Sequence, residues 1–422
     1  TANTEKTTHL DFNVGFQKWG FHTSASLSDF GDLKMGVHGP DDYLSLFYSE
    51  QINGRDVMVS NPTPRVQKFT NFQQIHLAQK VLFKATDDLK FDLGVQYSTT
   101  SDYPRYDRLA THDSEGILRY AEWNYGPQEW LLANIQMTKL SSRSNLYDKI
   151  KVSAAYQNFK ESRINRRFNA NTRKIREENV DAISLNFDFY KTLSTKSNIS
   201  YGTEYIYNKV GSAGHSENIR TDVTERIDTR YPDGSKWQTL AAYLSHKYKP
   251  NTNLTLQSGV RYNYVTIDAD LSANNTFFNL PFQMANLKTS ALTGTFGLSW
   301  NPNTTFLWKL NVTTAFRAPN IDDIGKIFES EPGLIVVPNS NLQPEYAYGG
   351  ELGLTVNLNE SITFDTSTYY TYLDNALVRK NFTVHGVSEM EYDGELSEIH
   401  AIQNASKSWI YGFEAGLKVR FS

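Results

Sequence analysis

The sequence predicts an all-β fold, a transmembrane antiparallel β-barrel. Apolar side chains recur at every second position along most of the chain, which is the period of a strand with one face in a different environment from the other. Of the 422 residues, only 39% are hydrophobic but 13% are aromatic. A barrel that hides alternate residues in lipid and rings both interfaces with aromatic side chains has this composition. The connections between the alternating segments are short and long in turn.

The alternation predicts about fifteen strands. No proline interrupts any of them, as expected for strands that must donate every backbone N–H to a neighbour. No run approaches eighteen apolar residues, which excludes transmembrane helices. In chain order the expected strands cover residues 10–16, 19–27, 75–83, 89–97, 131–137, 150–156, 183–189, 199–207, 240–244, 254–264, 292–300, 306–316, 346–358, 362–372 and 411–421.

Seven of the connections are tight, seven are long, and the two kinds alternate strictly. Short turns on one rim and long loops on the other are typical of outer-membrane barrels. A soluble β-sandwich of this size would need several domains with linkers, and a propeller or β-helix would show a fixed repeat, which the variable loops lack. The expected long loops cover residues 30–71, 100–129, 163–176, 208–236, 270–289, 317–345 and 379–407.

Charge and motif content narrow the function. The net charge is -4, with both signs interspersed, so nucleic acid is not an expected partner. The absence of cysteine excludes a disulfide scaffold and thiolate-bound zinc. The chain has no Gly-rich phosphate loop, no metal-type His/Cys spacing and no serine nucleophile elbow. We therefore predict that it is not an enzyme, and the sequence assigns no residue to a metal.

Two motifs flank the loop at residues 317–345. Phe316-Arg317-Ala318-Pro319 ends one expected strand, and Asn339-Ser340-Asn341-Leu342-Gln343-Pro344-Glu345 leads into the next. They resemble the boxes that TonB-dependent outer-membrane receptors carry at these places. Residues 105–109 (RYDRL) and 121–128 (AEWNYGPQ) resemble more specifically the haemoglobin/transferrin/lactoferrin (haem) receptor-like branch of Bacteroidetes-type bacteria.

The resemblance implies a barrel of about 22 strands with a plugged lumen. An odd count of about fifteen then suggests that residues 1–422 form a transmembrane barrel portion, with an N-terminal plug expected before Thr1 and closing strands expected beyond Ser422, because closed bacterial single-chain barrels have an even number. We expect the long loops to be extracellular and the short turns periplasmic, with outer-membrane lipid and lipopolysaccharide around the barrel.

The function that the resemblance implies is energy-coupled import of an iron complex, driven by the TonB–ExbB–ExbD complex through the plug. The ligand would be haem or haem-protein iron, or a ferric siderophore; haem would be transported and not held as a cofactor. A passive outer-membrane porin is the alternative from another class. A TonB-dependent importer of another nutrient, such as cobalamin or an oligosaccharide, is a further one.

Haem iron takes histidine or tyrosine as an axial ligand, which directs attention to such residues in the loops. The aromatic candidates form either a platform above the lumen or the upper interfacial girdle, and a loop histidine can also be a plain surface residue. The interval between Pro319 and Asn339, where haem receptors usually carry a histidine, has none, which counts against the familiar mode of haem binding. The loop candidates are Tyr103, Tyr106, His112, Trp123, Tyr125, His38, His215 and His385.

Two further groups of residues have alternative interpretations. Arg317 and Pro319 are expected to end their strand and set the exit of the loop, and not to touch ligand. Five arginines at residues 163–176 either bind lipopolysaccharide phosphates or an anionic siderophore through charge-assisted hydrogen bonds, or belong to a solvated loop balanced by Glu161, Glu177 and Glu178.

Overall fold

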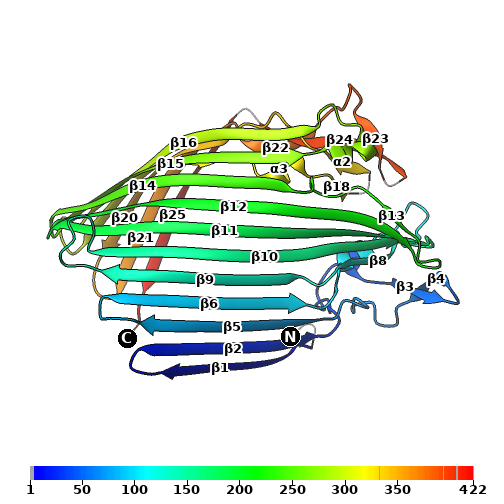
Figure 1. Cartoon of the computed structure of the whole chain (residues 1–422), viewed down its shortest axis with the longest axis horizontal. Coiled ribbons are helices and arrows are strands. Elements are labelled where there is room, and N and C mark those ends of the chain that lie inside the picture. The colour runs from blue at the N-terminus through cyan, green and yellow to red at the C-terminus, as the bar shows by residue number, and fades with distance from the viewer. Residues whose placement is uncertain (1–3, 332, 393, 405–406, 422) are drawn as a thin grey trace.

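A computed structural model of the chain describes residues 4–331, 333–392, 394–404 and 407–421. Most of them lie in one antiparallel sheet of 18 strands that curves into a barrel wall (Figure 1). Three of these strands are short additions at one end, which leaves fifteen long wall strands among the described residues. The predicted fold class and strand number are confirmed. No helix within these ranges is long and apolar enough to cross a membrane.

The long wall strands follow each other in chain order, each paired with the next. Among the described residues, the first and the last of them are paired on one side only. The wall strands are β1 (Lys6–Gly15), β2 (Trp19–Phe30), β5 (Phe72–Lys84), β6 (Leu89–Thr100), β9 (Glu129–Leu140), β10 (Lys149–Arg167), β11 (Thr172–Ser194), β12 (Ser197–Asn218), β14 (Ser235–Asn251), β15 (Leu254–Asp270), β16 (Met284–Trp300), β17 (Phe306–Arg317), β20 (Glu345–Asn357), β21 (Ile362–Asp374) and β25 (Lys407–Val419).

The other elements lie in the long connections, at the right-hand end of Figure 1, opposite the tight turns. They are η1 (Asp41–Tyr43), β3 (Phe47–Ile52), β4 (Arg55–Ser60), β7 (Tyr103–Pro104), α1 (Tyr106–Leu109), β8 (Tyr120–Tyr125), β13 (Thr224–Arg226), α2 (Ser272–Phe278), α3 (Ile321–Gly325), β18 (Phe328–Glu331), β19 (Leu334–Val336), β22 (Leu377–Asn381), β23 (Glu389–Tyr392) and β24 (Glu395–Asn404).

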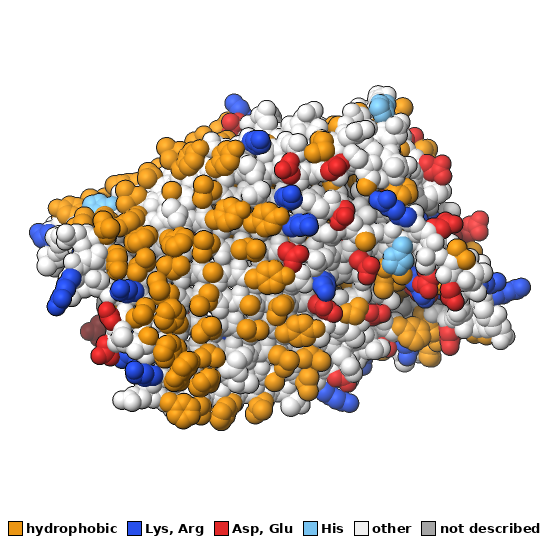
Figure 2. Space-filling view, in the orientation of Figure 1, with side chains coloured by type: hydrophobic (Ala, Val, Ile, Leu, Met, Phe, Trp, Pro, Cys, Tyr) orange, Lys and Arg blue, Asp and Glu red, His pale blue; other side chains and the backbone are white. Residues whose placement is uncertain are grey.

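An apolar band covers the outer face of the wall. Hydrophobic side chains gather over its middle and its turn end, whereas the loop end is mixed with charges (Figure 2). On neighbouring strands, Leu240, Val260 and Leu292 are 54%, 51% and 71% exposed. An outward-facing apolar band of this kind is the part of a transmembrane barrel that lipid covers, so the band marks the membrane-spanning height.

Strands β10, β11 and β12 continue well beyond this band. The expected loop at residues 163–176 is wrong: β10 and β11 stay paired up to Arg166 and Arg173, and only residues 168–171 turn. Outward positions of β11 change from Ile183 to Asp181 and Glu177 above the membrane, so the apolar alternation that identified the strand disappears while the strand continues. The expected loop at 208–236 is shortened for the same reason, because β12 runs to Asn218.

The apolar core lies inside the loop end of the barrel. The long connections after β17 and β21 fold inward as a five-stranded sheet, β18-β19-β24-β22 with β23 on β24. Ile324, Ile335 and Ile399 from these connections are fully buried against wall residues such as Ile267 and Ala285. The loops are therefore packed into a fixed body, and the surfaces that they present toward the lumen keep a defined geometry.

The first long connection forms a separate hairpin, β3–β4. Its turn is Asn53-Gly54, with φ of 50° and 75°, a pair of left-handed residues that matches the twist of a two-residue hairpin. This dipeptide signals a hairpin in the sequence, in a segment that the alternation predicts only as a loop. The hairpin pairs with no other strand in the described part of the chain and so depends on side-chain contacts for its position.

Candidate functional site

Strand β8 positions the most distinctive cluster of side chains at the loop end. It pairs with the extension of β10, with Tyr125 opposite Arg163 and Trp123 opposite Asn165. Because successive side chains of a strand point to opposite faces, Trp123 and Tyr125 face one side of β8 and Glu122 and Asn124 the other. Each side borders a cavity, and the two cavities differ sharply in their chemistry.

The cavity on the side of Trp123 and Tyr125, here named the cationic pocket, has a volume of about 430 Å³. Seven of its lining residues are lysine or arginine and two are glutamate. The wall contributes one part of the lining and the inward-folded loops the other. The lining residues are Arg105, Arg108, Tyr120, Trp123, Tyr125, Arg163, Asn165, Arg176, Arg230, Lys326, Ile327, Phe328, Glu329, Ser330, Glu331, Arg379 and Tyr392.

Aromatic rings separate the cations of the pocket. The Arg105 guanidinium lies 4.9 Å from the centre of the Trp123 ring, and that of Arg163 lies 5.0 Å from the Tyr125 ring. Lys326 and Arg379 lie 4.4 and 5.5 Å from the ring of Phe328. Such stacking holds cations in place while leaving guanidinium edges free to donate hydrogen bonds.

The carboxylates that neutralise these cations lie behind the lining. Arg163 contacts Glu161 at 2.7 Å and Glu178 at 2.9 Å, and Arg176 contacts Asp228 at 2.7 Å. None of the three carboxylates lines the cavity. The inner surface is therefore cationic although the surrounding protein balances much of its charge, which is an arrangement suited to a small anion and not to a long-range field.

Several polar groups of the pocket lack either an ion pair or a hydrogen bond. Among the described residues, Arg108 and Arg379 form no ion pair, and Arg108 donates only to the carbonyl oxygen of Ser330, at 2.9 Å. Nη1 of Arg230 and Oγ of Ser330 are buried without a hydrogen bond. The Arg230 side chain is only 9% exposed, and its nearest carboxylate oxygens lie 3.7 Å away. Since an unpaired buried donor is costly, these groups favour an acceptor-rich ligand.

Glu178 is the buried counter-ion at the back of the pocket. Its carboxyl lies above the membrane band, and Arg163 donates a hydrogen bond to one of its oxygens at 2.9 Å. Burial raises its pKa, Arg163 and Arg176 oppose this shift, and Glu161 adds to it, so that the pKa is about 7. The charge of the pocket is thereby sensitive to pH near neutrality.

Ion pairs fix the pocket walls to one another. Arg119, just before β8, contacts Glu329 of β18 at 3.2 Å and also Glu395 of β24. Glu395 in turn contacts Arg167 of β10 at 2.6 Å. Wall and inner sheet are thus joined on one side of the cavity by a chain of charges.

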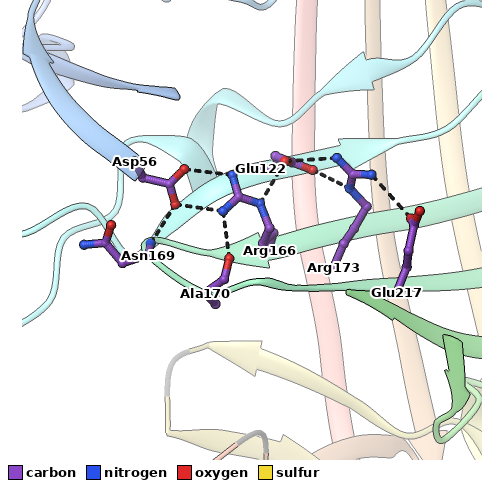
Figure 3. A network of polar contacts seen from close by, with 7 residues as sticks. All are labelled: Asp56, Glu122, Arg166, Asn169, Ala170, Arg173 and Glu217. Atoms are coloured by element: carbon purple, nitrogen blue, oxygen red, sulfur yellow. Dashed lines mark hydrogen bonds and ion pairs between the residues drawn. The ribbon is translucent and has the colours of Figure 1, made fainter. Parts of the chain in front are cut away.

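A second network, on the other face of β8, holds the β3–β4 hairpin (Figure 3). Arg166 binds Asp56 through two hydrogen bonds of 2.7 and 2.9 Å, and both side chains are almost fully buried. Glu122 accepts from Arg166 at 2.8 Å and from Arg173 at 2.7 Å. The five arginines at residues 163–176 are therefore neither a solvated loop nor, for Arg166, free to bind an outside phosphate.

The structure brings some of the sequence-predicted residues together. Trp123 and Tyr125 line the cationic pocket, where they form a platform and not a lipid-facing girdle. Tyr103 stacks on Tyr125 with ring centres 6.4 Å apart, at the edge of the pocket. Tyr106 lies on the other side, in the neighbouring cavity.

The predicted histidines do not join this cluster. None of His38, His112, His215 and His385 lines the cationic pocket. His215 lies within β12, opposite Ile175, and Nε2 of His385 lies 2.9 Å from the carbonyl oxygen of Asn279. Their assignment as ligand-binding residues stays a prediction without support from a shared cavity.

Other lining residues were missed by sequence reasoning. Arg230, Lys326, Phe328, Arg379 and Tyr392 come from three separate connections, and only the inward folding of these loops brings them together. Arg105 and Arg108 had a usable signal, since they belong to the RYDRL stretch. The stretch suggested a family and gave no geometry.

The two sequence motifs have structural contacts. Arg317 pairs with Asp323 at 2.9 Å and with Glu345, in the second motif, at 3.5 Å. Pro319 is fully buried just before the capping box that starts α3. Asn339 donates to the carbonyl oxygen of Ile402 and accepts from the backbone N–H of Asn341.

The remaining residues of the motifs complete this link between neighbouring strand ends. Leu342 is buried in the core, and the ring of Phe316 packs on that of Tyr346 with centres 5.5 Å apart. The contacts agree with the expectation that Arg317 and Pro319 end the strand and set the exit of the loop, because neither lines the cationic pocket. Ala318 and Pro344 are both half-buried.

Residues 85–422 match the sequence profile described as "TonB dependent receptor-like, beta-barrel". The chain belongs to this family. The family resemblance seen in the two motifs is thereby confirmed, and with it the outer-membrane type of the barrel.

The chain is also similar, at low identity, to individual proteins. The haemoglobin and haemoglobin-haptoglobin-binding protein A of Haemophilus influenzae is 29% identical over 134 residues, which are 31% of this chain and 12% of that protein. The copper transporter OprC superposes with a TM-score of 0.69 at 10% identity, over all of this chain and 57% of its own.

The haemophore receptor HasR of Serratia marcescens, solved with its haemophore and haem, gives a TM-score of 0.64 at 12% identity, over 98% of this chain and 60% of its own. At such identities the superpositions show the TonB-dependent receptor fold alone. The chain spans less than two thirds of the length of these relatives.

Proposed function

We propose that this TonB-dependent receptor barrel imports an anionic iron complex, which binds in the cationic pocket before energy-coupled passage. The observation that carries the proposal is a surface of seven cations layered with aromatic rings, whose carboxylate partners lie outside the cavity. Carboxylate or catecholate oxygens on a flat, conjugated ligand fit such a surface through charge-assisted hydrogen bonds and stacking.

Two ligand classes have this chemistry. A haem carries two propionates on a flat macrocycle, and a ferric siderophore of the catecholate type is a multiply charged anion with aromatic rings. The similarity to a haemoglobin-binding protein and to a haemophore receptor supports haem. The lining contains tyrosines but no histidine, so iron ligation by histidine in this pocket is not part of the proposal.

Family membership supports three further parts of this proposal. The energy comes from TonB–ExbB–ExbD acting on a plug, and the loop end that carries the pocket faces the outside of the cell. Outer-membrane lipid covers the apolar band, and lipopolysaccharide surrounds its upper edge. A porin would leave its lumen open at the loop end, whereas here the inward-folded loops pack into a core, which favours the receptor over this alternative.

Growth of a deletion strain provides the physiological test. A strain lacking the gene is supplied with haem or with a ferric catecholate siderophore as sole iron source, after other uptake routes have been removed. We expect growth to be lost on one of them and restored by the wild-type gene. Equal growth of deletion and wild-type strains on both would contradict an iron role.

Direct binding tests the pocket itself. Replacement of two unpaired cations, Arg108→Gln and Arg379→Gln, is expected to weaken binding of the ferric complex by about tenfold each, because each removes a charge-assisted hydrogen bond. Quenching of tryptophan fluorescence measures the affinity. Arg143→Gln, an exposed arginine in the tight turn between β9 and β10, is the matched control. An affinity unchanged in both pocket variants would refute the assignment.

A further inference from the structure

The cavity on the opposite face of β8 is a second, chemically distinct site. It lies between β8, α1 and the first long connection and has a volume of about 240 Å³. Lys68 and Glu122 are the charged residues in its lining, and Glu122 is already occupied by Arg166 and Arg173. With one charge of each sign the lining has no net charge, and we name this cavity the neutral cleft.

Aromatic rings form the apolar part of the neutral cleft. Tyr48 and Phe69 meet edge to face with ring centres 5.4 Å apart, and Tyr106 faces the same cavity from α1. Phe69 and Tyr106 remain 52% and 49% exposed. Exposed rings above the membrane band are available to a ligand in water.

Four polar side chains of the neutral cleft are uncharged and have no hydrogen-bond partner within the described part of the protein. Among the described residues, the side chains of Tyr48, Ser49, Tyr106 and Asn124 form no hydrogen bond within the protein. Hydroxyl and amide groups both donate and accept. They therefore match a partner whose own groups do both, which is the property of a sugar hydroxyl and not of a carboxylate or phosphate.

The backbone presents Phe69 to the cleft at a conformational cost. Its φ is 62°, in the left-handed region that a bulky residue rarely adopts. The neighbouring backbone is held there by Asp32, which accepts from the N–H groups of Thr70 at 2.9 Å and Asn71 at 3.1 Å. Strain of this kind persists only where the surroundings impose it, and here it holds a ring that meets Tyr48 and stays half exposed.

The β3–β4 hairpin, which forms one wall of the neutral cleft, is anchored on two sides. The hairpin is held by the buried Arg166–Asp56 pair (Figure 3), and Nη2 of Arg220 donates to the carbonyl oxygen of Gly54 at 2.9 Å. A site that exists before its ligand arrives loses little conformational entropy on binding.

We infer that the neutral cleft binds an uncharged saccharide, whose C–H face stacks on Phe69 and Tyr106 and whose hydroxyls bond to Ser49 and Asn124. The inference goes beyond import of an iron complex and does not depend on it. A sugar with this chemistry comes from a free oligosaccharide, from the glycan of a glycoprotein, or from a polysaccharide of the bacterial surface.

The test measures glycan binding to the purified, detergent-solubilised protein. It is applied to an array of neutral oligosaccharides of glucose, galactose, mannose and their N-acetylated forms, and the strongest binder is titrated by calorimetry. Phe69→Ala, Tyr106→Ala and Asn124→Ala are each expected to weaken its binding by about tenfold, the size of a lost ring contact or hydrogen bond. Tyr43→Ala, which removes a 67% exposed ring from the same connection but outside the cleft, is the control and should leave binding unchanged.

Three outcomes overturn the inference: no array member binds at millimolar concentration, all three cleft variants bind as Tyr43→Ala does, or the control weakens binding as much as they do. Retained binding of the iron complex by the same variants separates this result from any failure of the proposed function. Once glycan binding is established, a second experiment identifies the source of the glycan. Capture of a glycoprotein that is lost after glycosidase treatment indicates a host glycan, and capture of purified surface polysaccharide indicates the bacterial envelope.

Discussion

The six residues of strand β8 border two cavities that differ in charge, one on each face of the strand. Trp123 and Tyr125 face a pocket lined by seven cations, while Asn124 faces a cleft without net charge. The difference arises from what each face meets: inward-folded loops rich in arginine on one side, and the first connection with its aromatic rings on the other. In this barrel the loop that packs on a strand decides the chemistry of a binding surface, and the strand itself supplies only the alternation of side chains.

The largest effect is expected from breaking the anchor of the neutral side. Asp56→Asn leaves Arg166 buried with reduced compensation, and removing one partner of a buried pair costs about 3–5 kcal/mol. We expect residues 47–60 to detach and lose protection in hydrogen exchange. Glu217→Gln, at the half-exposed end of the same network (Figure 3), should leave protection unchanged. Unaltered exchange in the Asp56 variant would show that the network does not hold the hairpin.

A crossed pair of variants on β8 separates the two faces most sharply. Trp123→Ala should weaken binding of the ferric complex by about tenfold, through loss of stacking and of the contact with Arg105, and leave glycan binding intact. Asn124→Ala should do the reverse. Titration of both ligands into both variants measures all four affinities. Equal losses for both ligands in either variant would mean that the two cavities act as one site.

Sequence-based prediction works for the membrane-spanning part of the barrel and fails above it. The period of two and the alternation of tight and long connections predicted all fifteen wall strands, because lipid imposes one rule over the whole membrane height. Above the membrane, the strands continue without alternating apolar and polar residues. Arg163 and Arg176 were placed in a loop although they lie in strands, since their outward neighbours are polar.

The cationic pocket was predictable only in part. Trp123 and Tyr125 were identified as aromatic residues beside a family-like stretch. Arg230, Lys326 and Arg379 were not, because their proximity depends on how three loops fold into the lumen, and nothing in local periodicity encodes that. Asn53-Gly54 is the contrasting case, because this dipeptide signals the two-residue turn of a hairpin in the sequence itself.

The pH dependence of the cationic side is a smaller effect. Because the pKa of Glu178 is raised from 4.5 to about 7, the folded protein retains a proton that the unfolded chain has lost within this interval. The contribution of Glu178 to the free energy of unfolding is full below its pKa in the unfolded chain. It is lost as pH rises through its pKa in the folded protein. The melting temperature of Glu178→Gln should therefore fall less than that of wild type as pH rises from 4.5 to about 7. Parallel pH profiles would contradict the raised pKa.

The smallest expected effect is that of salt. Raising ionic strength from about 0.05 to about 0.5 M shortens the screening length and should weaken binding of the anionic complex several-fold, with less effect than at an exposed site because the guanidinium groups are partly buried. Binding of a neutral glycan should not change. A glycan affinity that falls with salt as steeply as that of the iron complex would show that the neutral cleft recognises charge.

The location of bound iron is the most direct test of the cationic pocket as the binding site. Crystals of the receptor soaked with haem or with a ferric catecholate complex are measured at the iron absorption edge, where anomalous scattering marks the metal. We predict one peak in the cationic pocket, between Trp123 and the guanidinium groups of Arg230 and Arg379. A peak at His38, His112, His215 or His385, with the pocket empty, would contradict binding of the iron complex in the cationic pocket.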